Sequence, residues 1–175
     1  MKELKRNRYQ FENSGRICRL FFTDGGSFIV DASDFNEVSE HYWQLGKRGY
    51  PVFRTSRKSE GGARNITLHT LLIRGMPGYD VDHINGDKMD NRRYNLRLCT
   101  HQQNMFNQGL RNTNSSGYIG VSYSKAMRKF ESYIHKDGHK MTIGYFDDPL
   151  EAAKARDRTA KTLFGVYARM NVLNQ

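Results

Sequence analysis

VDHINGDKMDNRRYNLRLCTHQQNMFN, residues 81–107, is the stretch from which the fold of this chain can best be predicted. It opens with a carboxylate beside a histidine, Asp82 and His83, followed by an Asn-Gly pair that is typical of tight turns. Asn95 lies thirteen residues after Asp82, and Asn104 lies nine residues after Asn95. This spacing of carboxylate, imidazole and amide groups is typical of a catalytic site.

The stretch resembles the HNH endonuclease motif, in the variant whose third position is asparagine. The resemblance implies a ββα-metal arrangement, in which two strands and the loop between them lead into a helix. It implies that His83 is the general base that takes a proton from the attacking water, and that Asn95 ties the loop and keeps His83 aimed. Asp82 and Asn104 are then the ligands of one divalent ion per active site, Mg²⁺ or Mn²⁺.

The chemistry of phosphodiester cleavage explains why these residue types are needed. Histidine suits the base because its ordinary pKa lies near neutrality. A hard cation accepts one carboxylate and one amide oxygen, and waters and the phosphate complete its coordination. Neighbouring residues of a strand point to opposite faces, so Asp82 and His83 serve one phosphate only if the strand ends or bulges there. A regular strand through His83 would count against the assignment.

A plainer interpretation is a solvated turn. An Asp-His pair before an Asn-Gly turn usually has no catalytic role, and isolated asparagines usually cap helices or bind the backbone. Here the pair, the turn, the run DNRRYNLR and a polar helix with Asn104 occur in order. The combination favours a nuclease.

Composition and charge indicate a globular protein with an anionic partner. The 175 residues suffice for one large or two small domains, and 37% are hydrophobic and 12% aromatic. The net charge is +10, and the excess is spread along the chain: residues 1–64 hold 12 basic and 8 acidic side chains, and residues 117–175 hold 10 and 6. The charge therefore predicts an anionic partner, and the resemblance to HNH endonucleases implies that this partner is double-stranded DNA.

The two cysteines and the N-terminus point to an intracellular protein. Cys18 and Cys99 lie far apart, so neither a zinc knuckle nor a disulfide framework is predicted, and both are expected to be small buried residues. The start MKELKRNRYQ has no apolar core, and no apolar run approaches membrane-spanning length. We expect a cytoplasmic protein of a phage-infected or bacterial host cell, without membrane contact.

The N-terminal region is predicted to form small hairpins and short helices. Residues 16–31 run apolar on both sides of an Asp-Gly-Gly turn, and a second antiparallel pair is expected at 49–55 and 64–69. A helix is predicted over 34–43, capped by Ser33 or Asp34, with Trp43 as a core anchor. A further helix opening at His69 should stop at Gly75. The nuclease domain is predicted to span 1–108, with a β-rich region over 1–66 and a ββα core over 67–108.

Basic residues near this core are candidate DNA contacts. Arg57 and Lys58 stand in a loop that could equally be a solvated loop. Arginine forks onto phosphate oxygens, so at least one of three arginines of the catalytic stretch should touch the backbone: Arg92, Arg93 and Arg97. Arg97 could instead pair with Asp87 or Asp90. Packing is the favoured role of His69, and His101 is a second choice as metal ligand.

Composition changes after a linker at 109–116, and the remaining residues 117–175 predict three strands and a helix. The strands are expected at 118–124, 129–135 and 140–146, and the helix from Pro149 to Phe164, with Asp148 as its cap and Gly165 as its stop. With GYIGV, TIGYFDDPLEAAKARDRTAKTLFG and YARMN, this segment resembles the plant ethylene-response-factor (APETALA-type) DNA-binding domain. That resemblance implies a helix behind a sheet whose exposed face enters the major groove.

Strand parity defines a candidate DNA face on this sheet. Lys129, Glu131, Tyr133 and His135 share one side of their strand, opposite Phe130, Ser132 and Ile134. The predicted DNA contacts of this domain are Ser122, Lys125, Arg128, Lys129, His135, Lys140 and Thr142. Ser122, His135 and Thr142 depart from the plant pattern, so the plant target cannot be inferred. A polar, solvated face is the alternative.

The sequence thus predicts an α+β protein: small β-hairpins and short helices leading into a ββα-metal (HNH) core, then a three-stranded antiparallel sheet packed on one helix. The predicted function is a metal-dependent DNA endonuclease of homing or phage type, nicking or cutting both strands. The alternative is a sequence-specific DNA-binding protein or repressor with a vestigial nuclease site. An RNA-binding module lacks the aromatic motifs expected of it. We expect a monomer, with a dimer as the alternative.

Overall fold

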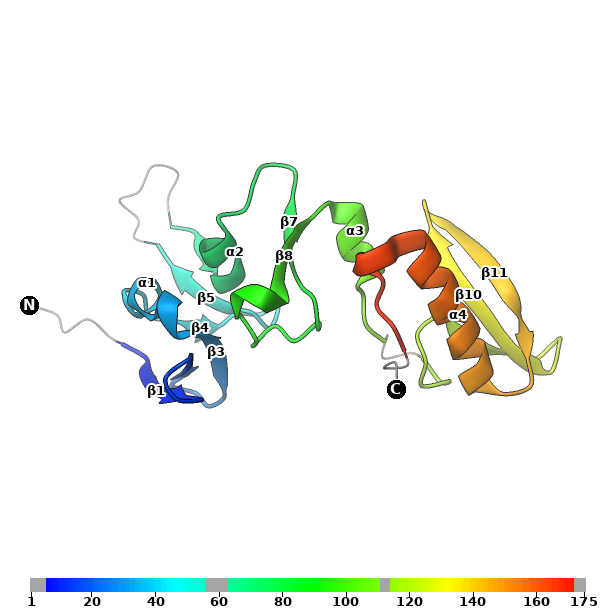
Figure 1. Cartoon of the computed structure of the whole chain (residues 1–175), viewed down its shortest axis with the longest axis horizontal. Coiled ribbons are helices and arrows are strands. Elements are labelled where there is room, and N and C mark those ends of the chain that lie inside the picture. The colour runs from blue at the N-terminus through cyan, green and yellow to red at the C-terminus, as the bar shows by residue number, and fades with distance from the viewer. Residues whose placement is uncertain (1–5, 56–62, 111–113, 172–175) are drawn as a thin grey trace, which may run out of the picture. The chain divides into compact units, whose positions relative to one another are not determined.

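The computed structural model describes residues 6–55, 63–110 and 114–171. The chain divides into two compact units, Met1–His101 and Gln102–Gln175. The division lies ahead of the linker predicted at 109–116. Both units combine small antiparallel sheets with few helices (Figure 1), which is the mixed α/β composition expected of the fold.

The first unit consists of three small antiparallel sheets and short helical segments. Its elements in chain order are β1 (Arg8–Glu12), β2 (Ile17–Phe21), β3 (Ser27–Asp31), the 3₁₀ turn η1 (Ala32–Asp34), α1 (Phe35–Ser39), β4 (Gln44–Leu45), β5 (Pro51–Arg54), β6 (Asn65–Thr67), α2 (Leu68–Ile73), β7 (Asp80–His83), η2 (Arg93–Asn95) and β8 (Leu96–Cys99). Helix α3 (His101–Phe106) begins at the last residue of this unit.

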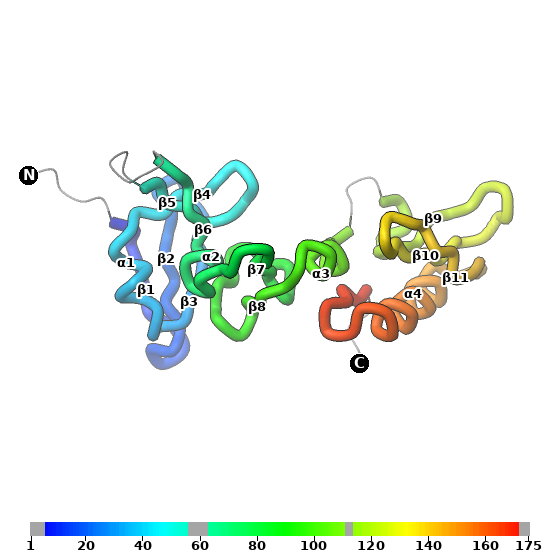
Figure 2. Tube along the Cα trace, turned by 90° about the horizontal axis from the view of Figure 1, so that it is seen from above, coloured from blue at the N-terminus to red at the C-terminus, as the bar shows by residue number. Residues whose placement is uncertain are grey.

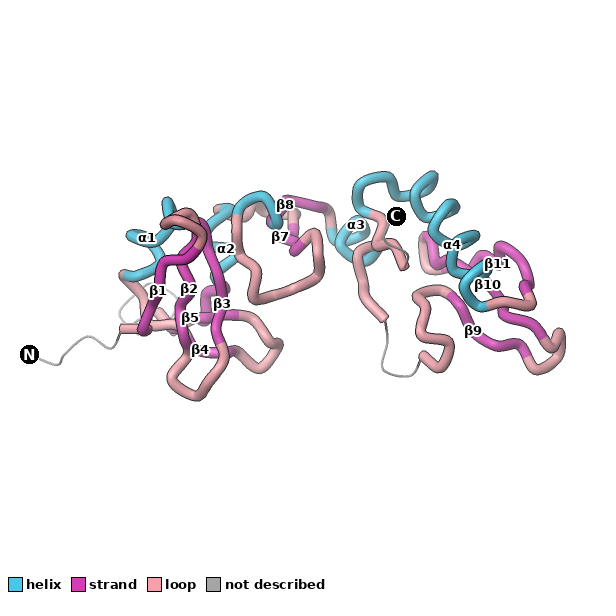
Figure 3. The backbone as a smooth tube through the Cα atoms, turned by 60° about the horizontal axis from the view of Figure 1, so that its bottom comes forward, coloured by secondary structure: helices cyan, strands magenta, loops and turns pink. Residues whose placement is uncertain are grey.

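The sheet β1-β2-β3 forms because β2 and β3 alternate apolar and polar side chains (Figure 3). Cys18, Leu20, Phe28 and Val30 point inward and are buried in one cluster with Trp43. The predicted hairpin and the role of Trp43 as a core anchor are confirmed. Strand β1 was not predicted, since its residues lie on the exposed edge of the sheet and carry no buried period.

The predicted end and the Asp34 cap of the first helix in this unit are wrong. The helix after β3 is α1, which ends at Ser39, and the Asp34 side chain forms no cap hydrogen bond because its carboxylate accepts from Arg93 instead. Helix α2 ends at Ile73, shortly before Gly75 as predicted, and Arg74, with φ 51°, is its left-handed end residue.

The second predicted strand pair is confirmed. Strands β5 and β6 pair antiparallel, and β4 extends the sheet on the other side of β5. Arg57 and Lys58 lie outside the described residues. Cys18 and Cys99 are free and buried, as predicted.

Strands β7 and β8, with the loop between them, form a two-stranded ladder that docks on the first sheet. Strands β7 and β8 pair antiparallel, and the loop between them runs past β3. The Ile29 amide donates to the carbonyl of Met89 over 2.9 Å, and the Asn91 amide donates to the carbonyl of Ile29 over 2.9 Å. The first sheet therefore holds the loop by backbone hydrogen bonds between residues about sixty positions apart in the chain.

The second unit has one sheet and one long helix. Its elements are β9 (Val121–Ser124), β10 (Lys129–Lys136), β11 (His139–Phe146), α4 (Pro149–Phe164) and the 3₁₀ turn η3 (Gly165–Tyr167), and the three strands order as β11-β10-β9. These elements confirm the predicted helix and the second and third strands, whereas the first strand begins at Val121 instead of residue 118 because residues 118–120 form a turn. Asp137 and Gly138 both have positive φ, as a two-residue hairpin turn requires.

Helix α4 packs on one face of this sheet (Figure 2). Ala152 and Ala153 are fully buried against Val121, and alanine at these positions lets the helix approach closely. The Asp148 side chain caps the helix by accepting from the Leu150 amide over 3.0 Å, as predicted. Glu151 in the first turn of the helix forms an ion pair with Lys154 at 2.9 Å. No helix within the described residues is long and apolar enough to cross a membrane.

Candidate active site

The end of strand β7 carries Asp82 and His83. The ladder is regular here, with Asp82 opposite Arg97 and His83 opposite Leu96, and the strand ends at His83. The strand ends at His83, as the assignment requires, but the ladder is regular up to and including His83 and contains no bulge, which counts against the assignment. The two side chains therefore leave the strand toward opposite faces, and both are buried, 8% and 4% exposed.

The imidazole of His83 is held by an asparagine that the sequence did not single out. His83 Nε2 lies 3.1 Å from Asn91 Oδ1, and Asn91 Nδ2 donates to the carbonyl of Lys88 over 3.0 Å. Because the Lys88 carbonyl fixes the amide orientation, Oδ1 faces His83 as an acceptor and Nε2 must carry the hydrogen. In the neutral ring the lone pair is then on Nδ1, which is the atom that can accept a proton.

The protonation state of His83 suits this role. Burial lowers the pKa of His83 below its ordinary value, although the hydrogen bond to Asn91 and the charge of Asp82 act in the opposite direction. The imidazole is therefore neutral at pH 7, and a neutral imidazole can act as a base.

Asn95 ties the loop that follows His83. Its side chain is 2% exposed, and its Nδ2 donates to Asn85 Oδ1 over 3.0 Å and to the carbonyl of Asp90 over 2.7 Å. Its Oδ1 accepts from the Asn85 amide over 3.0 Å. The backbone carbonyl of Asn95 accepts from the Ile84 amide over 2.8 Å. One buried amide thus fixes the two ends of the loop to each other.

Asp82 is paired with a cation across the ladder. Arg97 Nε and a terminal nitrogen donate to Asp82 Oδ2 over 3.0 and 2.7 Å. The partner of Arg97 is therefore Asp82, rather than Asp87 or Asp90. In this pair the Asp82 carboxylate is a charged, buried oxygen donor at the end of the strand.

The donor set predicted for a metal is small. Within the described residues of the chain, no cluster of three or more His, Cys, Asp or Glu side chains could hold an ion. The predicted set is one carboxylate, Asp82, and one amide, Asn104, which lies in α3 within the second unit. Both are oxygen donors, so their chemistry fits a hard divalent cation that keeps several waters.

Two rings surround His83 that sequence reasoning did not assign to the site. The ring of His69 meets His83 edge-on at 5.0 Å between centroids, and Tyr50 lies 4.8 Å from His69 and 5.9 Å from His83. Burial, then the proximity of His83 and of Lys88, lowers the pKa of His69 to about 4. His69 packs as the sequence favoured, but it packs on the candidate base. No sequence signal could have found Tyr50, since it directly precedes β5 and lies far from His83 in the chain.

The arginines predicted to contact DNA are engaged with carboxylates of the first unit. Arg92 pairs with Asp90 at 2.7 Å, and Arg93 pairs with Asp34 at 2.8 Å. The Arg93 amide also donates to Asp31 Oδ2 over 2.7 Å. Arg93 therefore links the loop between β7 and β8, residues 84–95, to η1. We call this segment the active loop. Half of the Arg93 side chain stays exposed.

In the second unit the predicted DNA residues lie on the sheet and its turns. Lys125, Arg128, His135, Lys140 and Thr142 are exposed, and Ser122 and Lys129 are half-buried. Opposite them, Ser132 and Ile134 are buried against α4, which is the strand parity that the sequence predicts.

Several of these side chains also contact one another. Lys140 donates to Glu131 over 2.7 Å and lies 4.4 Å above the Tyr133 ring, and Thr142 donates to Glu131 over 2.8 Å. The sheet face is thus polar and partly pre-arranged by internal hydrogen bonds.

Comparison with known proteins gives a consistent result. The family described as "HNH endonuclease" matches residues 74–106, which include Asp82, His83, Asn95 and Asn104. An uncharacterized HNH endonuclease, L560, of Acanthamoeba polyphaga mimivirus is 33% identical over 152 residues, which cover 85% of this chain and 77% of that protein. Protein 3.8 of Escherichia phage T7 is 32% identical over 92 residues, 53% of this chain and 75% of that protein.

No solved structure matches significantly. The mimivirus relative is aligned along most of both chains, and the family match spans the strand, loop and strand that hold His83. The chain therefore belongs to the HNH endonuclease family and is an endonuclease.

Proposed function

We propose that this protein is a metal-dependent endonuclease of the homing or phage type that hydrolyses phosphodiester bonds in double-stranded DNA. The observation that carries the proposal is the hydrogen bond between His83 and Asn91, because it assigns the lone pair of a neutral, buried imidazole to Nδ1. Asn91 of the same chain sets the tautomer of this base, so neither the substrate nor an ion has to set it.

Each residue of the site has a role in this proposal. His83 Nδ1 accepts the proton of the attacking water, and Asn91 holds the ring by its Nε2 hydrogen. Asn95 is a positioning residue that keeps the loop closed behind His83. We place the substrate phosphate at the end of β7, because a strand offers both of its faces to one group only where it ends.

Asp82 and Asn104 would hold Mg²⁺ or Mn²⁺. When bound, the ion supplies positive charge to the phosphate oxygens as charge develops on them. Arg97, which is already paired with Asp82 at 2.7 Å, would share the carboxylate with the ion and keep a second positive charge beside it.

The second unit would bind the duplex. Its exposed sheet face carries Lys140, the turn between β9 and β10 carries Lys125 and Arg128, and backbone contacts from such cations position a protein on DNA. The resemblance of this unit to the ethylene-response-factor type DNA-binding domain supports this role. It favours insertion of the sheet into the major groove.

The proposal is tested by cleavage of supercoiled plasmid with Mg²⁺, with Mn²⁺ and with chelator. We expect the wild type to cut only with metal, and His83→Ala to lose activity by at least about 100-fold. The matched control is His139→Ala, which removes an exposed histidine of the second unit and should retain activity. Open circles without linear product would indicate a nicking enzyme.

Two outcomes would contradict the proposal. Cleavage that is equal for His83→Ala and the wild type would remove His83 from the base role. Retained binding in a gel shift, together with no cleavage of any DNA in metal, would favour the DNA-binding alternative.

A further inference from the structure

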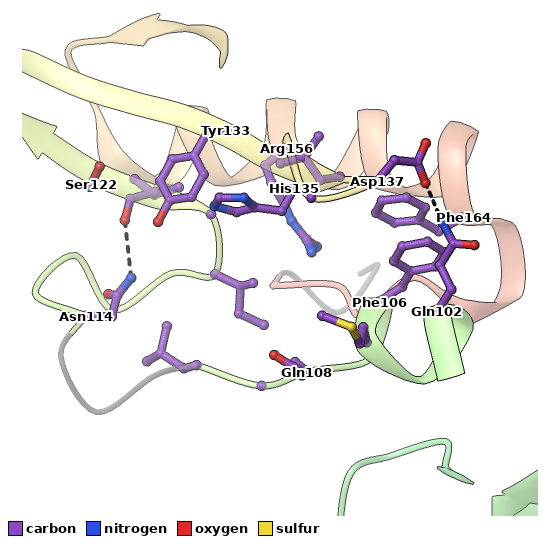
Figure 4. Close-up of a pocket in the computed structure, with 18 of the residues that line it drawn as sticks. Gln102, Phe106, Gln108, Asn114, Ser122, Tyr133, His135, Asp137, Arg156 and Phe164 are labelled. Atoms are coloured by element: carbon purple, nitrogen blue, oxygen red, sulfur yellow. Dashed lines mark hydrogen bonds between the residues drawn. The ribbon is translucent and has the colours of Figure 1, made fainter. Parts of the chain in front are cut away.

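The second unit contains a cavity of about 470 Å³ that the nuclease chemistry does not use (Figure 4). It lies between the end of β10, the helix α3 and the segment 108–110. Strand β9 pairs only with residues 129–132 of β10, so the later residues of β10 border the cavity instead of a neighbouring strand on that side. The volume is within the range of pockets that bind small molecules.

A buried arginine points into this cavity. Arg156 of α4 is 4% exposed, and its guanidinium extends past β10 into the space in Figure 4. One terminal nitrogen donates to Asp157 Oδ1 over 3.2 Å and to the carbonyl of Arg169. The Nε hydrogen is buried and has no hydrogen-bond partner. An unpaired buried donor is unfavourable, so an acceptor that reached this nitrogen from the cavity would remove that cost.

The fold makes room for this arginine. Gly120 has φ 70°, and a Cβ at this position would lie 3.0 Å from Arg156 Cγ and 2.4 Å from the Tyr133 carbonyl oxygen. Any larger residue would push the arginine away from the strand. The glycine therefore allows both the backbone turn and the path of the side chain.

The walls of the cavity join it to the proposed DNA face. Tyr133 and His135 belong to the side of β10 that carries the DNA candidates, and both line the cavity, with their rings 5.6 Å apart. Leu110 and Ile119 add apolar surface. Aromatic and apolar walls with one donor fork suit a planar base better than a bare phosphate.

We propose that this cavity binds a guanine base of the DNA strand that lies on the sheet face. The Nε edge of Arg156 offers two parallel donors, Nε and the second terminal nitrogen, and guanine offers two neighbouring acceptors, O6 and N7, on its major-groove edge. Adenine replaces one of these acceptors by a donor. The inference rests on the proposed DNA-binding role of the second unit, and it adds a base-specific site to it.

The test is calorimetric titration of the full chain with dGMP, dAMP, dCMP and inorganic phosphate, in chelator and moderate salt. We expect dGMP to bind at least about tenfold more tightly than dAMP or dCMP, and phosphate to bind much more weakly than dGMP. Equal binding of phosphate and dGMP would assign the arginine to a phosphate. Equal binding of all nucleotides, or none, would overturn the guanine site.

Two variants keep the test independent of folding. Arg156→Lys removes the Nε donor and should weaken dGMP binding at least about tenfold. Leu110→Trp fills the cavity without changing Arg156, and it should also abolish dGMP binding. Its matched control is Leu45→Trp, because Leu45 is equally exposed, 48% against 47%, and lies in the first unit. Unchanged dGMP binding in Leu110→Trp would place the nucleotide elsewhere.

A gel shift with duplex DNA separates this inference from the proposed function. Loss of dGMP binding in Leu110→Trp with retained duplex binding is expected if the cavity reads one base. If the wild type binds dGMP but no duplex, the cavity stands and the DNA-binding role fails. If the wild type binds duplex but not dGMP, the DNA-binding role stands and the guanine site fails.

Discussion

The loop between β7 and β8 in the first unit and the sheet face of the second unit both carry polar side chains, but in opposite environments. In the loop, Asp90, Asn91 and Asn95 are between 0% and 5% exposed, and each has several hydrogen-bond partners. On the sheet His135 is exposed to solvent, and so is Lys125 in the turn between β9 and β10. Buried polar groups need every partner, whereas exposed ones are exchangeable with water.

This difference in burial determines how strongly a single substitution should affect each site. A buried network fixes one geometry, so a single substitution should act sharply on both stability and activity. An exposed basic face acts through the sum of many weak contacts, so a single substitution should change affinity only slightly.

The largest effect is expected for Asn95→Ala, which would show how far the loop depends on one amide. The change leaves the Asn85 amide and the Asp90 carbonyl without this partner, so the first unit should lose about 3 kcal/mol of stability. Cleavage should fall at least about 100-fold. Denaturant unfolding followed by Trp43 fluorescence measures the stability, because the single tryptophan lies in the core of this unit.

The matched control for this prediction is Asn36→Ala, an exposed asparagine of the same unit. It should leave both the unfolding midpoint and the cleavage rate unchanged. If Asn95→Ala is inactive but as stable as the wild type, Asn95 contributes to activity and not to the stability of the loop. If the variant remains active, Asn95 has no role in the active site.

The second effect concerns acid. The folded pKa of His69 is about 4, below its ordinary value of 6.5, so the unfolded chain binds a proton there before the folded one does. Stability is therefore lost as the pH falls from 6.5 toward 4, and it is fully present above 6.5. His69→Phe keeps the ring but removes this titration, so between pH 7 and pH 5 the variant should lose about 2 kcal/mol less than the wild type.

Urea unfolding of wild type and variant at both pH values, again by Trp43 fluorescence, measures this difference. Protonation of carboxylates affects both proteins and cancels in the comparison. An identical loss in the two proteins would mean that His69 is not the group that makes the first unit acid-sensitive.

The sequence predicts what is local in both regions. The hairpin of β10 and β11 is found from its turn residues, and the positions of His83 and Asn95 are found from their spacing within one stretch. What the sequence does not predict depends on pairings between distant segments. Arg93 reaches Asp34 across 59 positions, and Asn91 is buried only because the loop docks on β3. A polar residue in a loop is ordinarily exposed, so its pattern gives no sign of burial.

The third effect tests whether the two units respond separately. Asp148→Ala removes the hydrogen bond that the Leu150 amide donates, and loss of an N-cap costs about 1 kcal/mol. The helical signal in circular dichroism should report this loss, because α4 is the longest helix, with 16 residues. Trp43 fluorescence should report no change if the first unit unfolds independently.

Asp147→Ala is the matched control for the cap, since Asp147 is the neighbouring carboxylate and its ion pair with Lys129 is exposed. It should cost much less, because exposed pairs contribute little. If both substitutions shift the Trp43 transition, the two units unfold together. The stability of each unit can then not be compared separately, and only the activities of their sites can.

The smallest effect is expected on the sheet face. Lys125→Ala removes one exposed charge from a turn, so duplex affinity should fall by about threefold and the salt dependence of binding should decrease by about one counterion. Lys161→Ala removes the same charge from α4, the helix that covers the other side of the sheet, and should leave both quantities unchanged. A gel shift over a range of salt concentrations measures both. If the two variants weaken binding equally, net charge rather than the sheet face attracts the DNA, and the second unit would lose its distinction as a specific binding surface. If Lys125→Ala alone abolishes binding, this exposed face behaves like the buried loop, with one side chain deciding the outcome.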